Sequence, residues 1–430
     1  MTHPRPFRRN FLLLQGPHGP FFHALAGMLR QAGCRVWRAG FNAGDRAFWP
    51  DAESYIAHTG SVADWPAHLD ALIQRLELTD IVLYGDARPV HAAAVRAARA
   101  AGLTVHVFEE GYLRPYWITY ERGGSNGNSR LMQLSLGEIR AALGARRPQV
   151  PDPPARWGDM RRHIFYGALY HAMVLAGHRR YRNMAPHRGV SVAAELRLYL
   201  RRLAGMPLHS LERARATRRI RRGGFPYHLA LLQLEHDASF QNYSPFSSMT
   251  EFLELCVRDF AAGAPHHHHL VFKAHPLEDG RVPLRTHVRR IARAHGVAAR
   301  VHFVRGGKLA ALLDQARSAV TVNSTSGQQA LLRGLPIRVF GEAVYAKPEF
   351  VSDQPLAAFF AAPRRPDLQA YRDFRHYLLE TSQIPGGFYS AQGRQRALRR
   401  VVDLMLATMD PYDMLRAGRT APRAHLAIAM

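Results

Sequence analysis

Cysteine is scarce in this sequence. The chain has 430 residues but only two cysteines, Cys34 and Cys256. They lie far apart in apolar surroundings, and neither belongs to a Cys-x-x-Cys or Cys/His pattern of the kind that binds zinc. A disulfide framework and a structural zinc site are therefore both unexpected, and the sequence suits a reducing cytoplasm.

Long apolar runs are also missing. No stretch offers the roughly 20 apolar residues that are needed to span a bilayer. The run from Phe11 to Leu14 is too brief for the apolar part of a signal peptide, and it leads directly into a Gly/Pro loop. We therefore expect a protein that is neither secreted nor integral to a membrane.

Acidic residues are few compared with basic ones. The sequence has 58 Lys and Arg against 33 Asp and Glu, a formal net charge of +25. Such an excess predicts attraction to nucleic acid, to an anionic lipid surface or to phosphorylated substrates, unless it only reflects a general bias toward arginine. No helix-turn-helix, zinc finger or RNP-like strand is present, so nucleic acid is not an expected partner.

The first part of the chain alternates short apolar segments with helical patterns. Strands are predicted at 11–14, 35–38, 81–84 and 105–108, and amphipathic or alanine-rich helices follow several of them. This alternation predicts a doubly wound parallel sheet whose loops meet at one edge, where ligands bind in such folds. The candidate residues at this edge are Gln15, Gly16, Asn42, Asp45, Asp86, Arg88, Glu109, Glu110 and Arg114.

Two adjacent carboxylates end the last of these strands. Glu109 and Glu110 are followed by Gly111, so a buried strand is expected to deliver both acids to its carboxyl end. Carboxylates that lie close together raise one another's pKa and suit acid–base chemistry. The alternatives are a solvated acidic turn and a structural ion pair with Asp86 and Arg88.

A second α/β alternation occupies the C-terminal half, with strands predicted at 227–234, 270–274, 300–304 and 319–322. Three hydroxyl residues and a glycine lie between the last strand and a helix from Gln328 to Arg333, which suits either phosphate binding or a simple N-cap. The four histidines at 266–269 are expected to form an exposed turn, and no metal site is predicted. The candidate substrate-binding residues here are Lys273, Pro276, Asn323, Ser324, Thr325, Ser326 and Gly327.

An arginine-rich region separates the two halves. From Arg161 to Arg222 the chain carries many arginines but only two acids, Glu195 and Glu212, and apolar residues recur at helical spacing. We expect helices with a basic flank that either lies on an anionic membrane surface or is simply solvated. The composition thus predicts an N-terminal lobe at 1–150, a helical insertion at 151–222, a second lobe at 223–390, and a C-terminal helix and tail at 391–430.

Eight stretches of the sequence together resemble the bacterial capsule polysaccharide β-Kdo transferases. They are LLLQGPHGPFF at 12–22, FNAGD at 41–45, YGDARPVH at 84–91, VFEEGYLRP at 107–115, WITYERGGSN at 117–126, KAHPLEDG at 273–280, VNSTSGQQAL at 322–331 and IPGGFY at 384–389. The resemblance runs through nearly the whole chain, except the arginine-rich middle and the last 40 or so residues.

This resemblance implies a GT-B-like fold, with two Rossmann-like lobes and a cleft between them. The N-terminal lobe would take the acceptor and the C-terminal lobe the donor, CMP-Kdo, without any cofactor. His275 would contact the CMP phosphate, flanked by the hydroxyl residues at 324–326. Asp237 would be the carboxylate nucleophile of a retaining reaction, and Glu109 or Glu110 the general acid/base.

The activity implied by the resemblance is a glycosyltransferase that adds the first Kdo of a capsule linker to lyso-phosphatidylglycerol. The protein would then be cytoplasmic and peripheral at the inner face of the inner membrane, beside other capsule synthesis and export proteins. Two alternatives are another CMP-sugar transferase, similar to sialyltransferases, and a non-catalytic adaptor for polysaccharide export.

Overall fold

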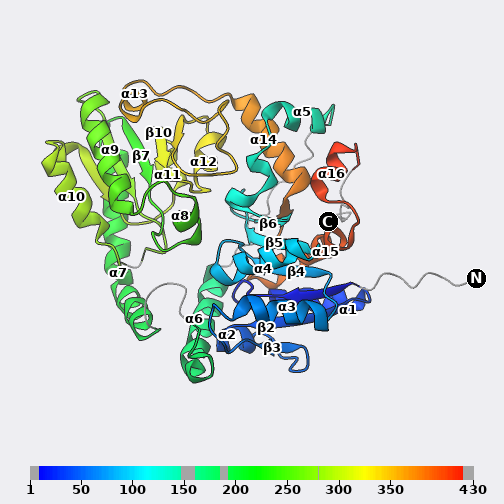
Figure 1. Cartoon of the computed structure of the whole chain (residues 1–430). Helices are drawn as coiled ribbons and strands as arrows, with labels where there is room; N and C mark the ends of the chain where they lie inside the picture. Colours follow the sequence, from blue (N-terminus) through cyan, green and yellow to red (C-terminus); the bar gives the residue numbers. More distant parts are fainter. Residues whose placement is uncertain (1–8, 147–159, 185–191, 279, 420–430) are drawn as a thin grey trace, which may run out of the picture. The chain divides into compact units, whose positions relative to one another are not determined.

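The computed structural model contains two compact α/β units (Figure 1). The residues that it describes are 9–146, 160–184, 192–278 and 280–419. Unit 1 comprises Met1–Gln133, Glu138–Val192 and His376–Met430, and unit 2 comprises Leu134–Gly137 and Ala193–Arg375. The chain therefore leaves unit 1 for unit 2 and returns to unit 1 near its end.

This division differs from the segments expected from composition. The arginine-rich region is shared between the units, because α6 (Met160–Ala176) lies in unit 1 whereas nearly all of α7 (Val192–Arg222) lies in unit 2. The start of the expected insertion, residues 151–159, falls outside the described residues, as does the end of the expected C-terminal tail from 420 onward.

The expected second lobe, 223–390, also ends earlier than predicted. Unit 2 ends at Arg375, and the chain after it adds a strand, β12 (Gln383–Pro385), to the sheet of unit 1. This strand pairs antiparallel with β6 (Trp117–Arg122). The sheet of unit 1 is thus completed by residues far away in the sequence.

The sheet of unit 1 has seven strands in the order β12-β6-β5-β4-β1-β2-β3. Its other strands are β1 (Asn10–Leu13), β2 (Arg35–Gly40), β3 (Tyr55–Ala57), β4 (Asp80–Tyr84) and β5 (Thr104–Glu110). Strands β1 to β5 run parallel, and β6 is antiparallel to β5. The strand order reverses between β1 and β4, the position where doubly wound sheets bind ligands at the carboxyl ends of their strands.

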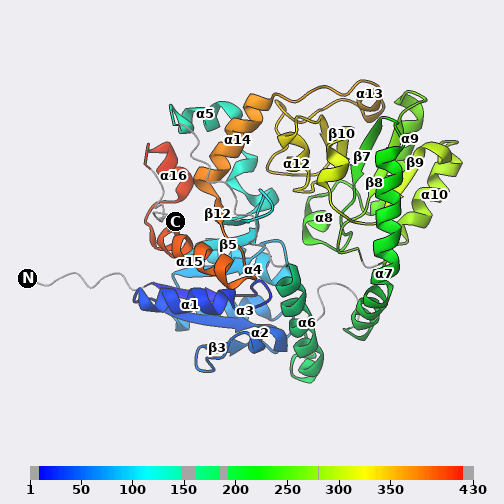
Figure 2. The ribbon, with the colours of Figure 1, turned by 180° about the vertical axis from the view of Figure 1, so that it is seen from behind.

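Helices cover both faces of this sheet, as its continuous apolar strands require. On one face α1 (Phe21–Gln31) and α15 (Ala391–Leu406) enclose a core around Phe108. On the other face α3 (Trp65–Arg75) and α4 (Pro89–Ala100) enclose a second core. Figure 2 shows α1 beside α15. Besides α6, the described part of unit 1 contains α2 (Ala43–Ala47), α16 (Pro411–Arg416), most of α5 (Leu136–Leu143) and the end of α14 (Leu368–Thr381). It also has 3-10 turns at Asn126–Asn128, Arg130–Met132 and His178–Tyr181.

Local sequence explains where several helices begin and end. Helix α4 begins with Pro89, whose fixed φ suits the first helical position, and Gly102 follows its end with φ +70°. Asn42 caps α2 by accepting a hydrogen bond from the Asp45 N–H at 2.9 Å. Ser248 caps α9 (Met249–Gly263) in the same way through the Glu251 N–H.

Unit 2 contains a five-stranded parallel sheet in the order β11-β10-β7-β8-β9. Its strands are β7 (Tyr227–Leu231), β8 (His269–Lys273), β9 (Val301–Val304), β10 (Ala316–Thr321) and β11 (Ile337–Val339). The order again reverses once, between β7 and β10, so both units have the Rossmann-like arrangement. The predicted α/β fold class is confirmed.

Aromatic and branched side chains form the core of unit 2. Helices α9 (Met249–Gly263) and α10 (Leu284–Ala294) pack Phe252, Phe260 and Val288 into it. The other helices of unit 2 are α8 (Ala238–Tyr243), α11 (Ala310–Leu313), α12 (Gly327–Leu332), α13 (Leu356–Ala361) and the first part of α14 (Leu368–Thr381), with a 3-10 turn at Ala298–Arg300. None of the helices searched among the described residues has the length and apolar character to cross a membrane.

Candidate active site

Glu109 and Glu110 end strand β5 and point to opposite faces of the sheet of unit 1, because side chains alternate along a strand. Glu110 shares its face with Phe108, and its Oε1 atom accepts hydrogen bonds from the hydroxyls of Tyr84 at 3.2 Å and Tyr389 at 3.1 Å. Burial and the nearby Glu110 carboxylate raise the pKa of both tyrosines well above the usual value. Both hydroxyls therefore stay protonated and act as donors.

Helix α6 and Arg114 contribute further groups beside Glu110. The ring of His163, on α6, stacks on the Tyr389 ring with a centroid distance of 4.1 Å and an interplanar angle of 6°. Burial lowers the pKa of His163, while the Glu110 carboxylate acts in the opposite direction. Arg114 is exposed and its Nε donates to the Gly111 carbonyl at 3.2 Å. Glu110 is thus a half-buried carboxylate among two hydroxyls, an imidazole and a guanidinium.

Glu109 has different surroundings. Its Oε1 accepts from the Glu110 N–H at 3.0 Å, and its Oε2 lies 3.5 Å from the Asn126 amide nitrogen. Gly85 is close by: its φ is +68°, and a Cβ there would lie 3.1 Å from Glu109 Oε2. The glycine after β4 therefore allows both the turn and the close approach of the carboxylate.

An ion pair of Asp86 and Arg88 with the glutamates was one alternative, and both residues have further contacts in the structure. Asp86 is buried, and its Oδ2 accepts from the Ser125 N–H at 2.9 Å and from the Asn128 side chain at 3.1 Å. It therefore holds the turn that follows β6. Arg88 is half-buried at the start of α4 and lies near enough to Tyr170 of α6 to affect the pKa of that hydroxyl.

Gln15, Asn42 and Asp45 lie together beneath α6. The Tyr170 hydroxyl donates to Asp45 Oδ1 at 3.1 Å and accepts from the Asn42 side chain at 2.7 Å. Gln15 donates to Asp45 Oδ2 at 3.1 Å, and Arg38 forms a buried ion pair with Asp45 at 3.3 Å. These polar groups bind one another inside unit 1 and fix α6 over the loops. Gly16, also a candidate, is buried against Phe22.

Glu121 on β6 is a buried carboxylate that the sequence patterns did not indicate. It accepts hydrogen bonds from the hydroxyls of Tyr112 at 2.7 Å, Tyr412 at 2.9 Å and Ser129 at 2.5 Å. Burial raises its pKa to about 7, although the three donors act in the opposite direction. Glu121 and Tyr112 lie within two of the stretches quoted above, but only the fold shows that they meet α16.

Asn323 joins the loops that follow β7 and β10 in unit 2. Its Oδ1 accepts from Gln233 Nε2 at 2.6 Å, and its own N–H donates to Gln233 Oε1 at 2.9 Å. Its side-chain nitrogen donates to the carbonyls of Ser239 at 3.0 Å and Tyr243 at 3.2 Å. Asn323 therefore holds together the two loops at the position where the strand order reverses. Gln233 is a second residue in this position, and the sequence patterns did not identify it.

Asp237 lies at the start of α8. Its N–H donates to the Leu234 carbonyl at 3.0 Å, and its own carbonyl accepts from the Gln241 N–H at 2.9 Å. The side chain does not cap the helix, and the residue is exposed. The loop after β7 thus presents this carboxylate to solvent at the carboxyl end of the sheet.

Lys273 is the last residue of β8, and His275 and Pro276 lie in the loop that follows it. Lys273 is 5% exposed, and burial together with Arg213 of α7 lowers its pKa to about 8. His275 Nδ1 accepts from the Leu277 N–H at 3.1 Å, which leaves the neutral ring with its proton on Nε2. Pro276 is exposed and packs against Gly306 of the loop after β9, with the Pro276 Cα 3.4 Å from the position of a Cβ there.

The hydroxyl-rich turn before α12 uses much of its own hydrogen-bonding capacity. Ser324 Oγ accepts from the Ser326 N–H at 3.2 Å, and the Gly327 N–H donates to the Ser324 carbonyl at 2.9 Å. The Thr325 carbonyl accepts from the Gln328 N–H at 3.1 Å. Gly327 is buried so closely against the Tyr345 hydroxyl that a Cβ would lie 2.3 Å from it. Because α12 has only six residues, a ligand at this turn would be bound mainly by the hydroxyl groups and less by the N-terminus of the helix.

In each unit, the carboxyl ends of the strands thus carry a set of candidate residues. In unit 1 it contains Glu109, Glu110 and Arg114, together with the unpredicted Tyr84, Tyr389 and His163. In unit 2 it contains Asp237, Lys273, His275, Pro276, Asn323 and the turn at 324–327. Among the described residues, no group of three or more His, Cys, Asp or Glu side chains could hold a metal ion. The first group can exchange protons, and the second can bind an anion.

Comparisons of the sequence with known protein sequences point to one family. The family described as "Capsule polysaccharide biosynthesis protein" matches residues 79–389. The capsule polysaccharide export protein KpsS of Escherichia coli is 30% identical over 89% of this chain and 97% of its own length. The capsule polysaccharide modification protein LipB of Neisseria meningitidis serogroup B is 29% identical over 89% of this chain and 92% of its own length.

A solved structure with a related description is KpsC of Thermosulfurimonas dismutans, a beta Kdo 2,7 transferase. It is 13% identical, with a TM-score of 0.42, over 92% of this chain and 100% of that chain. The family match covers all of unit 2 and about half of unit 1, and the two relatives extend it over nearly the whole sequence. This chain therefore belongs to the capsule polysaccharide biosynthesis protein family.

Proposed function

We propose that this protein is a retaining glycosyltransferase that transfers Kdo from CMP-Kdo to a lyso-phosphatidylglycerol acceptor, and so begins the linker of a capsule polysaccharide. The observation that supports this most directly is the cationic group at the carboxyl end of β8 in unit 2. There a buried lysine ends a strand of a Rossmann-like sheet, a histidine lies two residues further along the chain, and Arg213 is near the lysine. Such a group suits the single phosphate of a CMP-sugar.

The proposed roles follow the chemistry of each side chain. Lys273 and His275 stabilise the charge that develops on the departing CMP phosphate. The exposed Asp237 carboxylate attacks the sugar carbon and forms a covalent intermediate, as retention of configuration by double displacement requires. One of the two glutamates at the end of β5 removes the proton from the acceptor hydroxyl as it attacks that intermediate.

The remaining candidates would bind substrates or shape the site. We assign Ser324, Thr325 and Ser326 to the donor, and Arg114 to the acceptor phosphate. Asn323 and Asp86 would act indirectly, because their side chains already hold loops. We expect the protein to work at the inner face of the inner membrane, beside other capsule synthesis and export proteins, and to need no cofactor.

A donor-by-acceptor assay with mass-spectrometric analysis of the product tests this proposal. CMP-Kdo with lyso-phosphatidylglycerol should give a product heavier by one Kdo, while a CMP-sialic acid donor should give none. Asp237→Asn, Glu109→Gln, Glu110→Gln and His275→Ala each test one role. Glu53→Gln and Asp353→Asn, at exposed positions of units 1 and 2, are matched controls that should retain activity.

Two results would contradict the proposal. Turnover with a different CMP-sugar but not with CMP-Kdo would show that the protein is a transferase for another donor. Binding of glycolipid without turnover of any donor would favour a non-catalytic export adaptor, a function in keeping with the description of the E. coli relative as an export protein.

A further inference from the structure

The outer side of α6 in unit 1 is apolar. The exposed residues between His163 and Gly177 are Ile164, Phe165, Ala168, Ala172, Met173, Leu175 and Ala176. Phe165 is 61% exposed, Ile164 45%, Leu175 40% and Met173 38%. A helix on the surface of a protein usually carries polar residues on its solvent side. The middle of α6 therefore has the opposite character to that expected of a solvated helix.

The inner side of α6 is fixed to unit 1, so the helix cannot turn to bury these side chains. Tyr170 is hydrogen-bonded to Asn42 and Asp45, and its ring stacks on His18 with a centroid distance of 4.2 Å. The His163 ring stacks on Tyr389. These contacts come from the face of α6 opposite to the exposed apolar residues.

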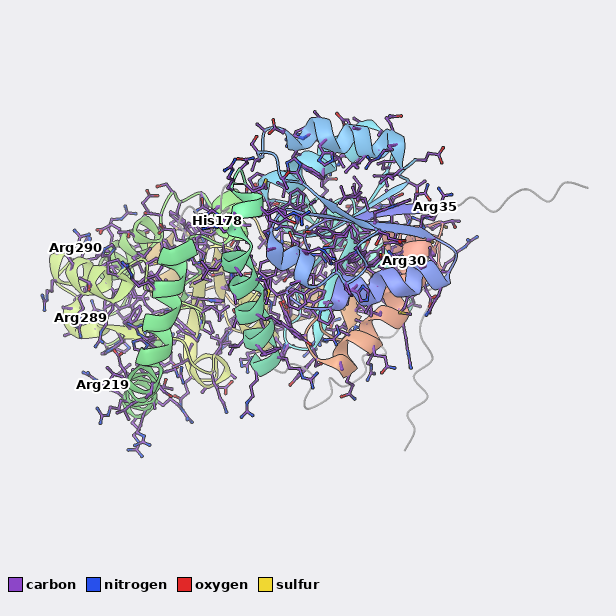
Figure 3. The ribbon with its side chains drawn as sticks, turned by 90° about the horizontal axis from the view of Figure 1, so that it is seen from below. Arg30, Arg35, His178, Arg219, Arg289 and Arg290 are labelled. Carbon is purple, nitrogen blue, oxygen red and sulfur yellow. The ribbon has the colours of Figure 1, made fainter. Side chains whose placement is uncertain are left out.

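Positive charge marks both ends of this helix. Arg161 and Arg162 precede the apolar stretch, and Arg179, Arg180 and Arg182 follow it; all five are exposed. No Asp or Glu occurs anywhere from Met160 to Met184. His178 lies beyond the last turn of the helix (Figure 3). Exposed apolar side chains between clusters of cations fit a surface that offers both acyl chains and negative headgroups.

We propose that the outer side of α6 docks on an anionic phospholipid bilayer. The 17 residues of α6 would extend for about 25 Å at 1.5 Å per residue, less than the roughly 30 Å of a hydrocarbon core. The helix therefore lies in the plane of the interface. Phe165 and Leu175 enter the boundary of the acyl chains, and the arginines at both ends contact headgroup phosphates.

This surface deepens the proposed function and rests on it, because a lipid acceptor has to be met at a bilayer. The inner side of α6 contacts the loops that hold Asn42 and Asp45, and through His163 and Tyr389 it lies next to Glu110. A docked α6 would bring this edge of the sheet of unit 1 to the depth of the headgroups, where the hydroxyl of a lysophospholipid lies.

Co-sedimentation of the full-length protein with vesicles tests the surface. The wild type should bind vesicles that contain phosphatidylglycerol at least ten-fold more tightly than vesicles of phosphatidylcholine alone. Phe165→Ser combined with Leu175→Ser should weaken binding by about ten-fold at both low and high salt, because buried apolar area is lost. Arg161→Gln combined with Arg162→Gln should weaken binding mainly at low salt.

Matched controls come from unit 2. Leu332→Ser with Leu368→Ser removes two apolar side chains that are 59% and 39% exposed, and Arg289→Gln with Arg290→Gln removes two exposed arginines of α10 (Figure 3). Neither pair should change vesicle binding. Every variant should keep the melting temperature of the wild type within a few degrees, since exposed positions contribute little to stability.

Several outcomes would contradict the proposal that the outer side of α6 docks on a bilayer. One is wild-type protein whose vesicle binding does not depend on phosphatidylglycerol. Another is a Phe165→Ser, Leu175→Ser variant that binds vesicles as tightly as the wild type. A third is a wild-type dimer, seen by sedimentation velocity, that becomes monomeric in this variant without any dependence on lipid. Because vesicle binding needs no nucleotide sugar, it can succeed even where the transferase assay fails. The variant should also retain turnover on detergent-dispersed lipid, which separates docking from catalysis.

Discussion

Tyr389 donates a hydrogen bond to Glu110 at 3.1 Å across 279 residues of sequence. The chain returns to unit 1 after Arg375, adds β12 to the sheet and places Tyr389 just before α15. Tyr84, at the end of β4, donates to the same carboxylate oxygen. The carboxylate at the end of β5 is therefore oriented by two separate parts of the chain.

Replacing these donors should affect activity more than stability. Tyr389→Phe removes one hydrogen bond, so the free energy of unfolding should fall by about 1 kcal/mol. Because the carboxylate loses its orientation, kcat for transfer should fall on the order of ten-fold. Tyr389→Phe with Tyr84→Phe should reduce kcat further. Tyr166→Phe, a tyrosine of α6 whose ring packs edge-on against Phe48, is the control. Unchanged kcat in the double variant would exclude a positioning role for the two hydroxyls.

Glu121 should make stability depend on pH. Its pKa is about 7 in the folded protein against 4.5 for an ordinary glutamate, so between these values the folded state binds the extra proton. The free energy of unfolding should therefore fall as the pH rises from about 4.5 to about 7, and level off above. Urea denaturation of Glu121→Gln at a series of pH values should show a flatter dependence, with Glu53→Gln as the control. An identical slope in wild type and Glu121→Gln would show that another group is responsible.

The main features of the fold were predictable because parallel strands are continuous apolar runs with helices between them. The strands predicted at 81–84 and 105–108 are β4 and β5, with only small changes at their ends. Strand β12 was not predicted, because it has three residues and exists only through its pairing with β6. Local propensity contains no sign of a partner more than 250 residues away.

For the candidate residues, too, the sequence indicates a position but not the distant residues that contact it. A strand that ends in two glutamates indicates where they lie, but it does not reveal that tyrosines from β4 and from the start of α15 donate to Glu110. Asp45 was a candidate for ligand contact at the edge of the sheet, yet it is buried with Arg38 and Tyr170. The frequent arginines around α6 also concealed that its exposed middle is apolar, since the direction of each side chain depends on which face packs against α2.

Metal removal should leave the proposed reaction unchanged. The leaving group of a CMP-sugar has one phosphate, and in the proposed mechanism Lys273, Arg213 and His275 would supply positive charge or hydrogen bonds to it without a metal ion. Turnover after dialysis against a chelator should therefore equal that of the untreated protein. Loss of turnover that is restored by added Mg²⁺ or Mn²⁺ would contradict this assignment.

Lys273 should make donor binding depend on pH. Its pKa of about 8 in the free protein means that it loses its proton as the pH rises through that value, and only the protonated amine attracts a phosphate. The affinity for CMP, measured by calorimetry above pH 7.5, where the phosphate of CMP is already doubly ionised, should fall by up to ten-fold per pH unit above pH 8. Lys273→Arg keeps its charge at all these pH values, so its affinity should not change with pH. A pH-dependent affinity in Lys273→Arg would assign the titration to another group.

Asn323 allows a more specific test of the loops around the proposed donor site, because its amide has a fixed orientation. Its oxygen accepts from Gln233, while its nitrogen donates to two carbonyls. Asn323→Asp is nearly the same size but places a negatively charged oxygen against the Ser239 and Tyr243 carbonyls. We expect a loss of about 2 kcal/mol in the free energy of unfolding, together with weaker CMP binding.

Asn242→Asp is the matched control for this change. Asn242 lies on α8 in the exposed part of the same loop region, and its side chain donates to the Ala238 carbonyl at 2.8 Å. Because water can replace that hydrogen bond, its loss should cost well under about 1 kcal/mol and leave CMP binding unchanged. If Asn323→Asp behaved like this control in both measurements, the bonds between the loops after β7 and β10 would not hold the donor site in shape.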